Sequence, residues 1–494
     1  MTNLPTTVLL ETDRFLIDLG EDDAVRDECG IFAVYAPGED VARYTYFALQ
    51  ALQHRGQESA GIAVGDDETV TCVKNLGLVA QVFRDSDLNA LQGDFAIGHT
   101  RYSSKNESSS FAESQPQLSS IGRQLVALAH NGNLVEISQL RARLAEHGIT
   151  LETRSNSEAL ATIISDFTMK HHHIRDGMVE TMGLIEGAYA VVLMTENAIY
   201  AFRDPHGIRP LVIGKLAENK GLVVASETSA LDIIGATFMR DVRPGEIIKI
   251  SNNGLESMQG ATAEREAMCV FEFAYLARPD SVFDGKTVYE MRHRMGEILA
   301  GEAPVEADLV MGTPSSGIPG AIGFSAGSGI AYGEGLMRNS YVGRTFIEPS
   351  QSLRRLGVRL KLNPIRSSIK DKRIVLVDDS IVRGTTMREL VKTLRASGAR
   401  EVHLRITSPP VLWPCFYGVD TDTREQLIAA SLSLEGIREF TGADSVAFIS
   451  LEGMVEATGR RADQLCLACF NEDYPVPISE EVKVSKKGRE TWKD

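Results

Sequence analysis

The sequence lacks the features that would place the protein in a membrane, in the secretory pathway or on nucleic acid. No apolar run approaches the roughly 20 residues that a membrane-spanning helix needs. Lys and Arg number 51 against 67 Asp and Glu, and the net charge of −16 argues against a general nucleic-acid-binding surface. The first 28 residues are acidic, without a basic start, which argues against a secretory or mitochondrial address and predicts a cytoplasmic protein. This segment is either a disordered leader or a removable propeptide.

Cysteine is also scarce, which excludes a disulfide framework in a cytosolic enzyme of this size. The six cysteines are Cys29, Cys72, Cys269, Cys415, Cys466 and Cys469. Cys466 and Cys469 form a C-x2-C pair, and such a pair alone can serve zinc, an iron–sulfur cluster, redox chemistry or packing. Cys269 and Cys415 lie in apolar surroundings and would each be read as core residues. Cys72 matches no site and is expected to be structural.

The 494 residues are enough for two or three domains. Residues 29–260 contain short apolar strands punctuated by glycine, with helical patterns near 40–53 and 157–170, which predicts an α+β domain of stacked sheets. Residues 261–475 change to strand–loop–helix units, which favours an α/β domain with a mainly parallel sheet. Residues 476–494 form a charged tail. The run 171–173 of three histidines ends a helical pattern and is interpreted as a solvated helix end rather than a metal site.

The stretch "IVLVDDSIVRGTT", residues 374–386, is the most specific motif of the chain. Asp378 and Asp379 follow a buried strand, at the edge where ligands bind in open α/β sheets. The loop 380–386 then leads into a helix, whose N–H groups favour an anion. Two carboxylates beside such a loop suit ribose hydroxyls and Mg²⁺. A capped helix start is the alternative, but a cap needs only one of these polar residues.

This motif resembles the binding signature of type I phosphoribosyltransferases for phosphoribosyl pyrophosphate. The resemblance implies that Asp378 and Asp379 hold the ribose hydroxyls and one Mg²⁺ ion per subunit. It also implies that "TPSSG", residues 313–317, is the pyrophosphate loop, with Ser316 near the metal. The remaining residues implied for this substrate are Gly317, Arg344, Lys361, Ser380, Arg383, Gly384, Thr385 and Thr386.

Between these loops the acidic protein concentrates positive charge. The cationic residues of this segment are Arg338, Arg344, Arg354, Arg355, Arg359 and Lys361. Such a segment could close over a leaving pyrophosphate, exclude water and stabilise charge. A solvated basic surface loop is the alternative, and the neighbouring phosphate loops favour closure.

Cys29 stands at the start of the apolar run 31–35, where a cysteine is usually inert packing. Downstream, Asn131 and Gly132 are expected in a turn between strands, where a side-chain amide and a backbone N–H could form an oxyanion hole. Arg101 suits a substrate carboxylate. If cleavage freed Cys29, its α-amino group, with a pKa of about 7.7–8.0, could act as the base.

"CGIFAVY", "LQHRGQESAGI", "HTRYS" and "HNGNL" resemble the N-terminal-nucleophile glutamine amidotransferases, whose domain is an αββα sandwich. With the phosphoribosyl motif, the chain from Cys29 to about residue 475 resembles the glutamine phosphoribosylpyrophosphate amidotransferases. The resemblance implies the first step of purine biosynthesis, in which phosphoribosyl pyrophosphate, glutamine and water give 5-phosphoribosylamine, glutamate and pyrophosphate. It implies Cys29 as nucleophile and Asn131 with Gly132 as oxyanion hole. The residues implied for glutamine are Arg55, Arg101, Tyr102 and Asn156, and Tyr275 is implied for the internal ammonia path.

One branch of this family combines a propeptide with a 4Fe–4S cluster, and this chain resembles that branch. The implied ligands of one cluster per subunit are Cys269, Cys415, Cys466 and Cys469, although four thiolates can also hold zinc. The family further implies a homotetramer or homodimer and feedback inhibition by purine nucleotides. Two positions depart from the family pattern: Asn156 stands where Asp is usual, and Ser315 where an acidic residue is common.

Two other functions compete with this interpretation. A glucosamine-phosphate synthase would share the amidotransferase motifs but has no use for "LVDDSIVRGTT". A nucleotide-sensing transcription regulator could share the phosphoribosyltransferase fold, but the retained Cys29 and aspartate pair and the acidic charge argue against it.

Overall fold

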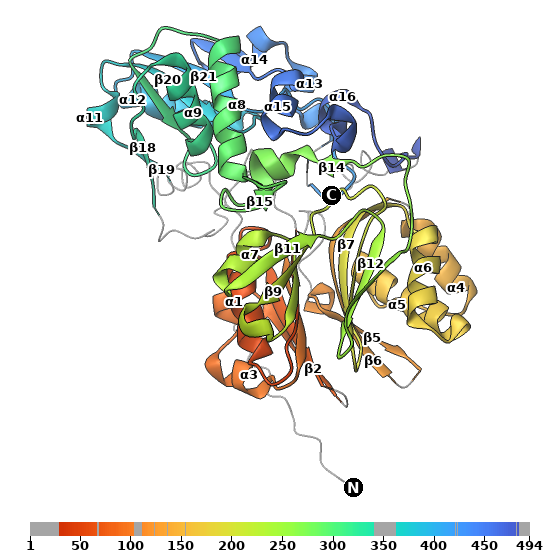
Figure 1. The fold of residues 1–494 in the computed structure, drawn as a ribbon. Coiled ribbons are helices and arrows are strands. Elements are labelled where there is room, and N and C mark those ends of the chain that lie inside the picture. The colour runs from red at the N-terminus through yellow and green to blue at the C-terminus, as the bar shows by residue number, and fades with distance from the viewer. Residues whose placement is uncertain are drawn as a thin grey trace.

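The computed structural model describes residues 29–480, 482 and 483, apart from 67–68, 103–110, 123, 136, 154, 340–361, 420 and 422. The chain forms two lobes, with the first half in the lower lobe of Figure 1 and the second half in the upper lobe. Within the described residues, no helix is both long and apolar enough to cross a membrane.

The first lobe contains a seven-stranded antiparallel sheet in the order β11-β9-β10-β1-β4-β2-β3. Its strands are β1 Gly30–Tyr35, β2 Ser59–Gly65, β3 Val70–Leu76, β4 Phe95–Arg101, β9 Val212–Leu216, β10 Leu222–Ala225 and β11 Ala236–Asp241. The central strand β1 is buried along its whole length, as its unbroken apolar run predicts.

A second, six-stranded antiparallel sheet has the order β13-β12-β8-β7-β6-β5. Its strands are β5 Gln117–Ile121, β6 Gln124–Leu134, β7 Gly187–Met194, β8 Ile199–Arg203, β12 Glu246–Ser251 and β13 Gly254–Gln259. The helices of this lobe are α1 Val41–Ala51, α2 Val79–Val82, α3 Asp85–Ala90, α4 Ile137–Glu146, α5 Asn156–His171, α6 Ile174–Leu184 and α7 Thr228–Ile233.

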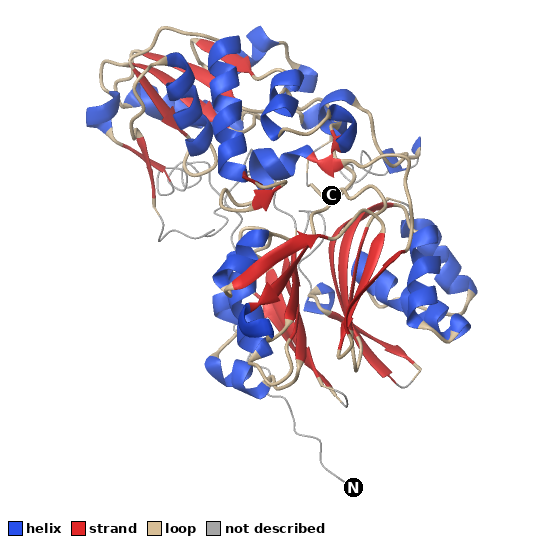
Figure 2. Cartoon of the chain, viewed as in Figure 1, coloured by secondary structure: helices blue, strands red, loops and turns tan. Residues whose placement is uncertain are grey.

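The two sheets face each other, and helices cover the outer face of each (Figure 2). Three apolar clusters fill these layers. One lies between the sheets and includes Ile31 and Ala129, one lies under α1 and includes Phe32, and one lies under α5 and α6 and includes Leu128. Alternate residues of a strand therefore serve different layers, as the pleat requires. The αββα sandwich expected from the sequence is confirmed.

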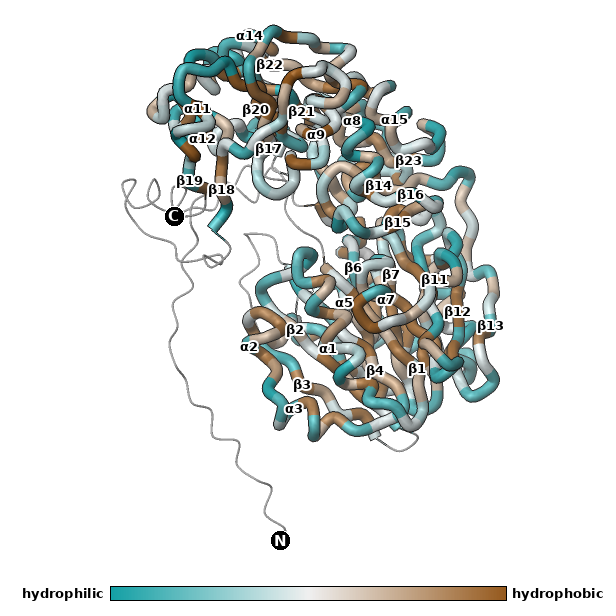
Figure 3. Tube along the Cα trace, turned by 60° about the vertical axis from the view of Figure 1, so that its left-hand side comes forward, coloured by the Kyte–Doolittle hydropathy of each residue, from teal (hydrophilic) through white to brown (hydrophobic). Residues whose placement is uncertain are grey.

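The second lobe is built on a four-stranded parallel sheet in the order β17-β20-β21-β22. Its strands are β17 Leu309–Gly312, β20 Arg373–Asp378, β21 Glu401–Ile406 and β22 Ser445–Phe448. The helices around it are α8 Val288–Glu302, α9 Ile318–Ser328, α11 Arg366–Ile369, α12 Thr385–Ala396, α13 Ile428–Ser431, α14 Leu434–Thr441, α15 Leu451–Thr458 and α16 Ala468–Asn471. Apolar residues, brown in Figure 3, concentrate on central strands such as β20. The predicted α/β domain is confirmed.

Short pairings complete this lobe and join it to the first. They are β14 Met268–Cys269 with β23 Leu465–Cys466, β15 Val282–Phe283 with β16 Lys286–Thr287, and β18 Leu336–Arg338 with β19 Leu362–Pro364. A single π-helical turn, Glu272–Leu276, lies between β14 and β15. Val476, the first residue of the expected tail, is buried, and its carbonyl accepts from the hydroxyl of Tyr417 at 2.6 Å.

Candidate active sites

Cys29 immediately precedes β1, the strand that lies between β10 and β4 in the first sheet. Its thiol is half-buried and donates to the carbonyl of Tyr102 across 3.6 Å. Tyr102 follows β4, whose last residue is Arg101. The end of β4 thus brings the residues expected to bind glutamine next to the expected nucleophile.

The sequence places Asn131 and Gly132 in a turn, and this expectation is wrong. Both residues lie inside β6 and pair with Ala190 and Tyr189 of β7. The eleven-residue strand continues to Leu134, so a dipeptide typical of hairpin turns is here part of a long strand. Gly132 has a φ of +124°, and a Cβ there would lie 2.1 Å from the carbonyl oxygen of Ala188. Only glycine fits this position.

The Asn131 side chain has the properties of a prepared donor. It is fully buried, and neither its nitrogen nor its oxygen has a hydrogen-bond partner among the described residues. It has the same strand parity as Ala129, so it faces the space between the two sheets. An unsatisfied buried amide costs stability and therefore needs a reason. An oxyanion that forms only during the reaction would supply one.

The other residues expected at glutamine differ in how they are held. Arg101 is buried and pairs with Glu113 at 2.6 Å. Asn156, the first residue of α5, donates its amide N–H to the side-chain oxygen of Asn133 at 2.8 Å. Asn133 in turn donates to the carbonyl of Phe416 in the second lobe at 2.9 Å. The expected contact of Asn156 with glutamine stays a prediction.

Arg55 is engaged by protein carboxylates instead of lying open to a ligand. Its side chain is 1% exposed and contacts Glu227 and Glu272, with 2.6 Å between Nη2 and Glu272 Oε2. Because both carboxylates are fully buried, the guanidinium is held where it lies. Its assignment to glutamine stays a prediction, but this geometry points to a structural position.

The phosphate site forms at the carboxyl end of the parallel sheet. Asp378 ends β20, and its carboxylate accepts from the N–H of Asp379 at 3.0 Å, while Ser380 donates to Asp379 at 2.7 Å. Both aspartates are buried, at 8% and 5% exposure. Burial, reinforced by the neighbouring carboxylate of Asp379, raises the pKa of Asp378 well above its usual value. A cation would relieve this repulsion, so the donor set fits a bound Mg²⁺.

The two expected phosphate loops lie side by side because β17 and β20 are neighbours. A Cβ on Gly317 would lie 2.4 Å from the carbonyl oxygen of Val377, so the backbone of "TPSSG" lies directly against β20. Gly384, with a φ of +79°, turns the second loop into α12. Ser316, Arg383, Thr385 and Thr386 belong to these same two loops.

Part of the cationic segment can be placed. Arg338 of β18 donates to Ser315 in the pyrophosphate loop at 3.4 Å. Arg344, Arg354, Arg355, Arg359 and Lys361 lie outside the described residues, as does the expected propeptide. Closure of this segment over pyrophosphate therefore stays a prediction.

Four cysteines that are far apart in the sequence line one cavity. Cys269 and Cys466 are register partners of β14 and β23, and Cys415 and Cys469 complete the set. The other lining residues are mostly apolar, among them Ile208, Phe271 and Tyr417. Burial raises the pKa of Cys466 to about 12, so the thiols stay protonated until a cation binds. Cys72 lies elsewhere, in β3.

The spacing of these thiols distinguishes the possible metal groups. Among the described residues, no three or more His, Cys, Asp or Glu side chains converge closely enough to hold one metal ion. A zinc site needs four ligands about 2.3 Å from a single ion. A cluster with several irons holds its thiolates farther apart, so four thiols around one apolar cavity fit the cluster better.

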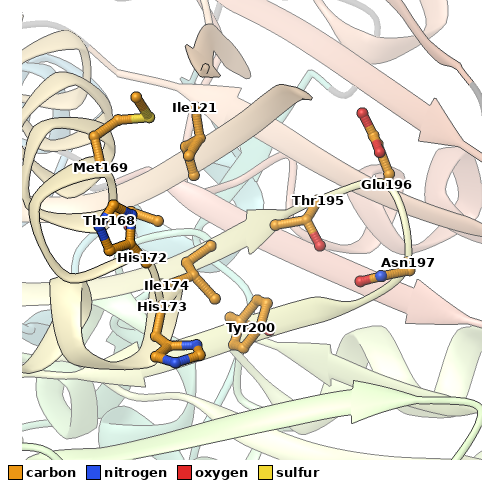
Figure 4. Close-up of a pocket in the computed structure, with 10 residues that line it drawn as sticks. All are labelled: Ile121, Thr168, Met169, His172, His173, Ile174, Thr195, Glu196, Asn197 and Tyr200. Carbon is orange, nitrogen blue, oxygen red and sulfur yellow. The ribbon is translucent and has the colours of Figure 1, made fainter. Parts of the chain in front are cut away.

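The largest surface pocket of the described residues lies away from these sites. It measures about 390 Å³, between the end of α5 and the turn after β7. Figure 4 shows His172 and His173 on one side of it and Glu196 and Asn197 on the other. His172 adopts a left-handed φ of 61° where α5 ends, which agrees with the helix end expected for the histidine run.

The sequence analysis missed a set of buried charges at the boundary between the lobes. These residues are Arg209, Glu227, Glu272 and Arg292, each at most 4% exposed. The available signal was a charged residue within an apolar stretch, as in "VVASET" and "FEFAYL". This signal indicates a buried ion pair but does not identify the partners.

Comparisons with known proteins agree with this geometry. A family model described as a glutamine amidotransferase domain matches residues 99–233. An amidophosphoribosyltransferase of Synechococcus elongatus is 51% identical over 489 residues, which cover 99% of this chain and 98% of the relative. The Mycobacterium tuberculosis amidophosphoribosyltransferase is 49% identical over 474 residues, covering 93% and 89%. A solved structure of the Bacillus subtilis glutamine phosphoribosylpyrophosphate amidotransferase, in complex with ADP and GMP, is 44% identical and covers 92% of this chain and 98% of its own, with a TM-score of 0.86.

Proposed function

The chain belongs to the amidophosphoribosyltransferase family, and on this premise we propose how its own residues divide the reaction. It is a glutamine-dependent phosphoribosyltransferase that catalyses the first step of purine biosynthesis. Phosphoribosyl pyrophosphate, glutamine and water give 5-phosphoribosylamine, glutamate and pyrophosphate. Relatives that match over nearly the whole chain leave no room for a glucosamine-phosphate synthase or a transcription regulator.

In the first lobe, the Cys29 thiolate attacks the glutamine amide carbon, and the new oxyanion accepts from the Asn131 amide and the Gly132 N–H. Collapse of this intermediate releases ammonia and leaves a glutamyl thioester, which water hydrolyses to glutamate. Removal of residues 1–28 would give Cys29 an α-amino group, which can take the thiol proton. Arg101, with Tyr102 beside it, holds the glutamine carboxylate. The exchange of Asp for Asn156 leaves an amide oxygen for the α-ammonium, which weakens the contact.

In the second lobe, Asp378 and Asp379 hold the ribose hydroxyls and Mg²⁺, and the loop 380–386 holds the 5-phosphate. The loop with Ser316 and Gly317 holds the pyrophosphate. The bound Mg²⁺ supplies positive charge next to the leaving pyrophosphate. Ammonia reaches ribose C1 inside the protein, past Tyr275 on the π helix. The contact of Arg338 with the pyrophosphate loop supports closure of the cationic segment.

We further propose that Cys269, Cys415, Cys466 and Cys469 hold one 4Fe–4S cluster. The convergence of the four thiols on one apolar cavity supports this. The cluster would tie β14, the 415 loop and the 466–469 turn together and make the protein sensitive to oxygen. Anaerobically purified protein should be brown, contain about four iron and four sulfide per chain, and begin at Cys29. A colourless, zinc-loaded, active protein that begins at Met1 would refute both the cluster and the processing.

Regulation, assembly and location follow from the family in the same way. Purine nucleotides are the expected feedback inhibitors, consistent with the ADP and GMP named for the Bacillus subtilis structure. A homotetramer or homodimer in the cytoplasm is the expected form.

One observation carries the mechanism: Cys29 with its oxyanion donors and the aspartate pair with its phosphate loops lie in separate lobes. The decisive experiment compares phosphoribosylamine formation from glutamine with that from an ammonium salt. The wild-type protein should use both donors, and Cys29→Ala should use only ammonium. Loss of both activities in a folded variant that retains its metal content would refute this division.

A further inference from the structure

A buried ion network crosses the boundary between the two lobes. Arg55 and Arg209 belong to the first lobe, and Glu272 is the first residue of the π helix in the second. Arg55 Nη2 lies 2.6 Å and Arg209 Nη1 lies 3.7 Å from the Glu272 carboxylate, and all three side chains are at most 1% exposed. The start of the π helix is therefore fixed by charges from the other lobe.

A second carboxylate of the first lobe holds the segment that follows the π helix. Glu227 pairs with Arg55 and accepts from the N–H of Arg278 at 2.9 Å and from the hydroxyl of Ser281 at 2.5 Å. Burial alone would raise the pKa of Glu227, but Arg55 and His54 hold it well below its usual value. Arg55 thus joins two carboxylates that together fix both ends of residues 272–281.

The second lobe holds the same π helix from its other side. Arg292 of α8 donates to the carbonyls of Phe273 at 2.9 Å and Ala277 at 2.8 Å. Burial lowers the pKa of Arg292 to about 10, and the first charge that opposes this shift is that of Asp379 in the phosphate site. The Arg292 guanidinium therefore lies within the field of Asp379 while it holds the turn that carries Tyr275.

This arrangement is costly unless its geometry is needed. Buried ion pairs often stabilise a fold less than apolar side chains of the same volume would. The π-helical turn is itself an uncommon element that occurs often at functional sites. Here it is closed by the Ala277 N–H, which donates to the Glu272 carbonyl at 3.1 Å.

We propose that Arg55, Glu272 and Arg292 are positioning residues that clamp the π helix between the two active sites and so couple glutamine hydrolysis to phosphoribosylamine synthesis. The inference rests on the proposed function. None of the three touches a substrate. Arg55 and Glu272 transmit the position of the helix to the glutamine site, and Arg292 transmits it to Asp379.

The test uses Arg55→Lys, Glu272→Gln and Arg292→Lys in the full-length protein with its metal content checked. Three quantities are measured: glutamate formed per phosphoribosylamine, the factor by which phosphoribosyl pyrophosphate changes the glutamine KM, and turnover with ammonium. Arg240→Lys is the matched control, because Arg240 pairs with the buried Glu246 at 2.8 Å within the first lobe, outside the clamp. The free energy of unfolding is measured for every variant.

The wild-type protein and Arg240→Lys should form about one glutamate per phosphoribosylamine, as the reaction requires. The clamp variants should form excess glutamate, lose most of the factor between the two substrates, which is typically about 5–150-fold for coupled sites, and keep ammonium turnover within about twofold. If Glu272→Gln does not fold, the two charge-retaining variants carry the test.

Two results would overturn the proposal. One is a ratio that stays at one in folded clamp variants. The other is an equal fall of both half-reactions in step with lost stability, because the residues would then be merely structural. A wild-type protein that forms no phosphoribosylamine would instead refute the proposed function, so the two failures are distinguishable.

Discussion

Replacement of Asn131 by leucine should raise stability while it removes activity. The Asn131 amide is fully buried with no hydrogen-bond partner among the described residues. A buried, unsatisfied polar group costs about 1–3 kcal/mol, and an apolar side chain of similar volume avoids that cost. The free energy of unfolding should therefore rise by about 1–3 kcal/mol. Loss of one oxyanion donor should lower glutamine-dependent kcat by about 100–1,000-fold.

Asn133, two residues along the same strand, provides the matched control. Its amide donates to Phe416 at 2.9 Å and accepts from Asn156 at 2.8 Å, so it is satisfied in the folded protein. Asn133→Leu leaves both partners unpaired and should lower the free energy of unfolding by about 1–3 kcal/mol. The same substitution should thus have opposite signs at positions 131 and 133.

Denaturant unfolding of both variants, and initial rates with glutamine and with ammonium, would test this reasoning. Ammonium-dependent turnover of Asn131→Leu should stay near the wild-type value, because its acceptor site lies in the other lobe. A destabilised Asn131→Leu protein would show that the amide is satisfied before substrate binds. An unchanged glutamine-dependent kcat would show that Asn131 does not contact the oxyanion.

Three further outcomes follow from the same geometry. Asp378→Asn should lower kcat/KM for phosphoribosyl pyrophosphate by about 1.5–3 kcal/mol in barrier terms with either nitrogen donor; an unchanged value would make the aspartate a helix cap only. Asn156→Asp should lower the glutamine KM, since a charged acceptor binds the α-ammonium more strongly; an unchanged KM would show that Asn156 does not meet that group. His99 and His130 are buried, which lowers the pKa of each to about 3, so the unfolded chain binds protons first as the pH falls. The free energy of unfolding should fall by about 1.4 kcal/mol per imidazole for each pH unit below 6.5 down toward 3, and His99→Asn should remove about half of this slope in denaturant titrations; a slope that the variant leaves unchanged would refute it.

Local order in the sequence was enough to predict one active site in outline. In "IVLVDDSIVRGTT" the strand, the carboxylates, the loop and the helix follow one another without interruption. Since parallel strands end at the same edge of a sheet, the strand that precedes "TPSSG" had to deliver this loop to the same edge. The architecture of both lobes was predictable in the same way, from strand patterns together with a family resemblance.

The Asn-Gly pair shows where local rules fail. Asn-Gly between apolar runs is a strong hairpin signal, because both residues tolerate a positive φ. In β6 only Gly132 uses that freedom, and it does so because the carbonyl of Ala188 in β7 approaches to a distance that excludes any Cβ. The reason for the glycine therefore lies on a neighbouring strand some 56 residues away in the chain, and the dipeptide alone cannot distinguish a turn from such a contact.

Arg55 marks the same limit for charge. The motif "QHRGQ" places an arginine near a glutamine site, and a substrate carboxylate is a reasonable partner for it. The carboxylates that it contacts lie 172 and 217 residues later, one in each lobe. A sequence shows that Glu272 interrupts an apolar stretch, and the cost of burying a lone charge then requires a cationic partner. It cannot show that one arginine serves two lobes. That joint use, visible only in the folded chain, makes Arg55 a candidate for coupling the two active sites instead of binding at one of them.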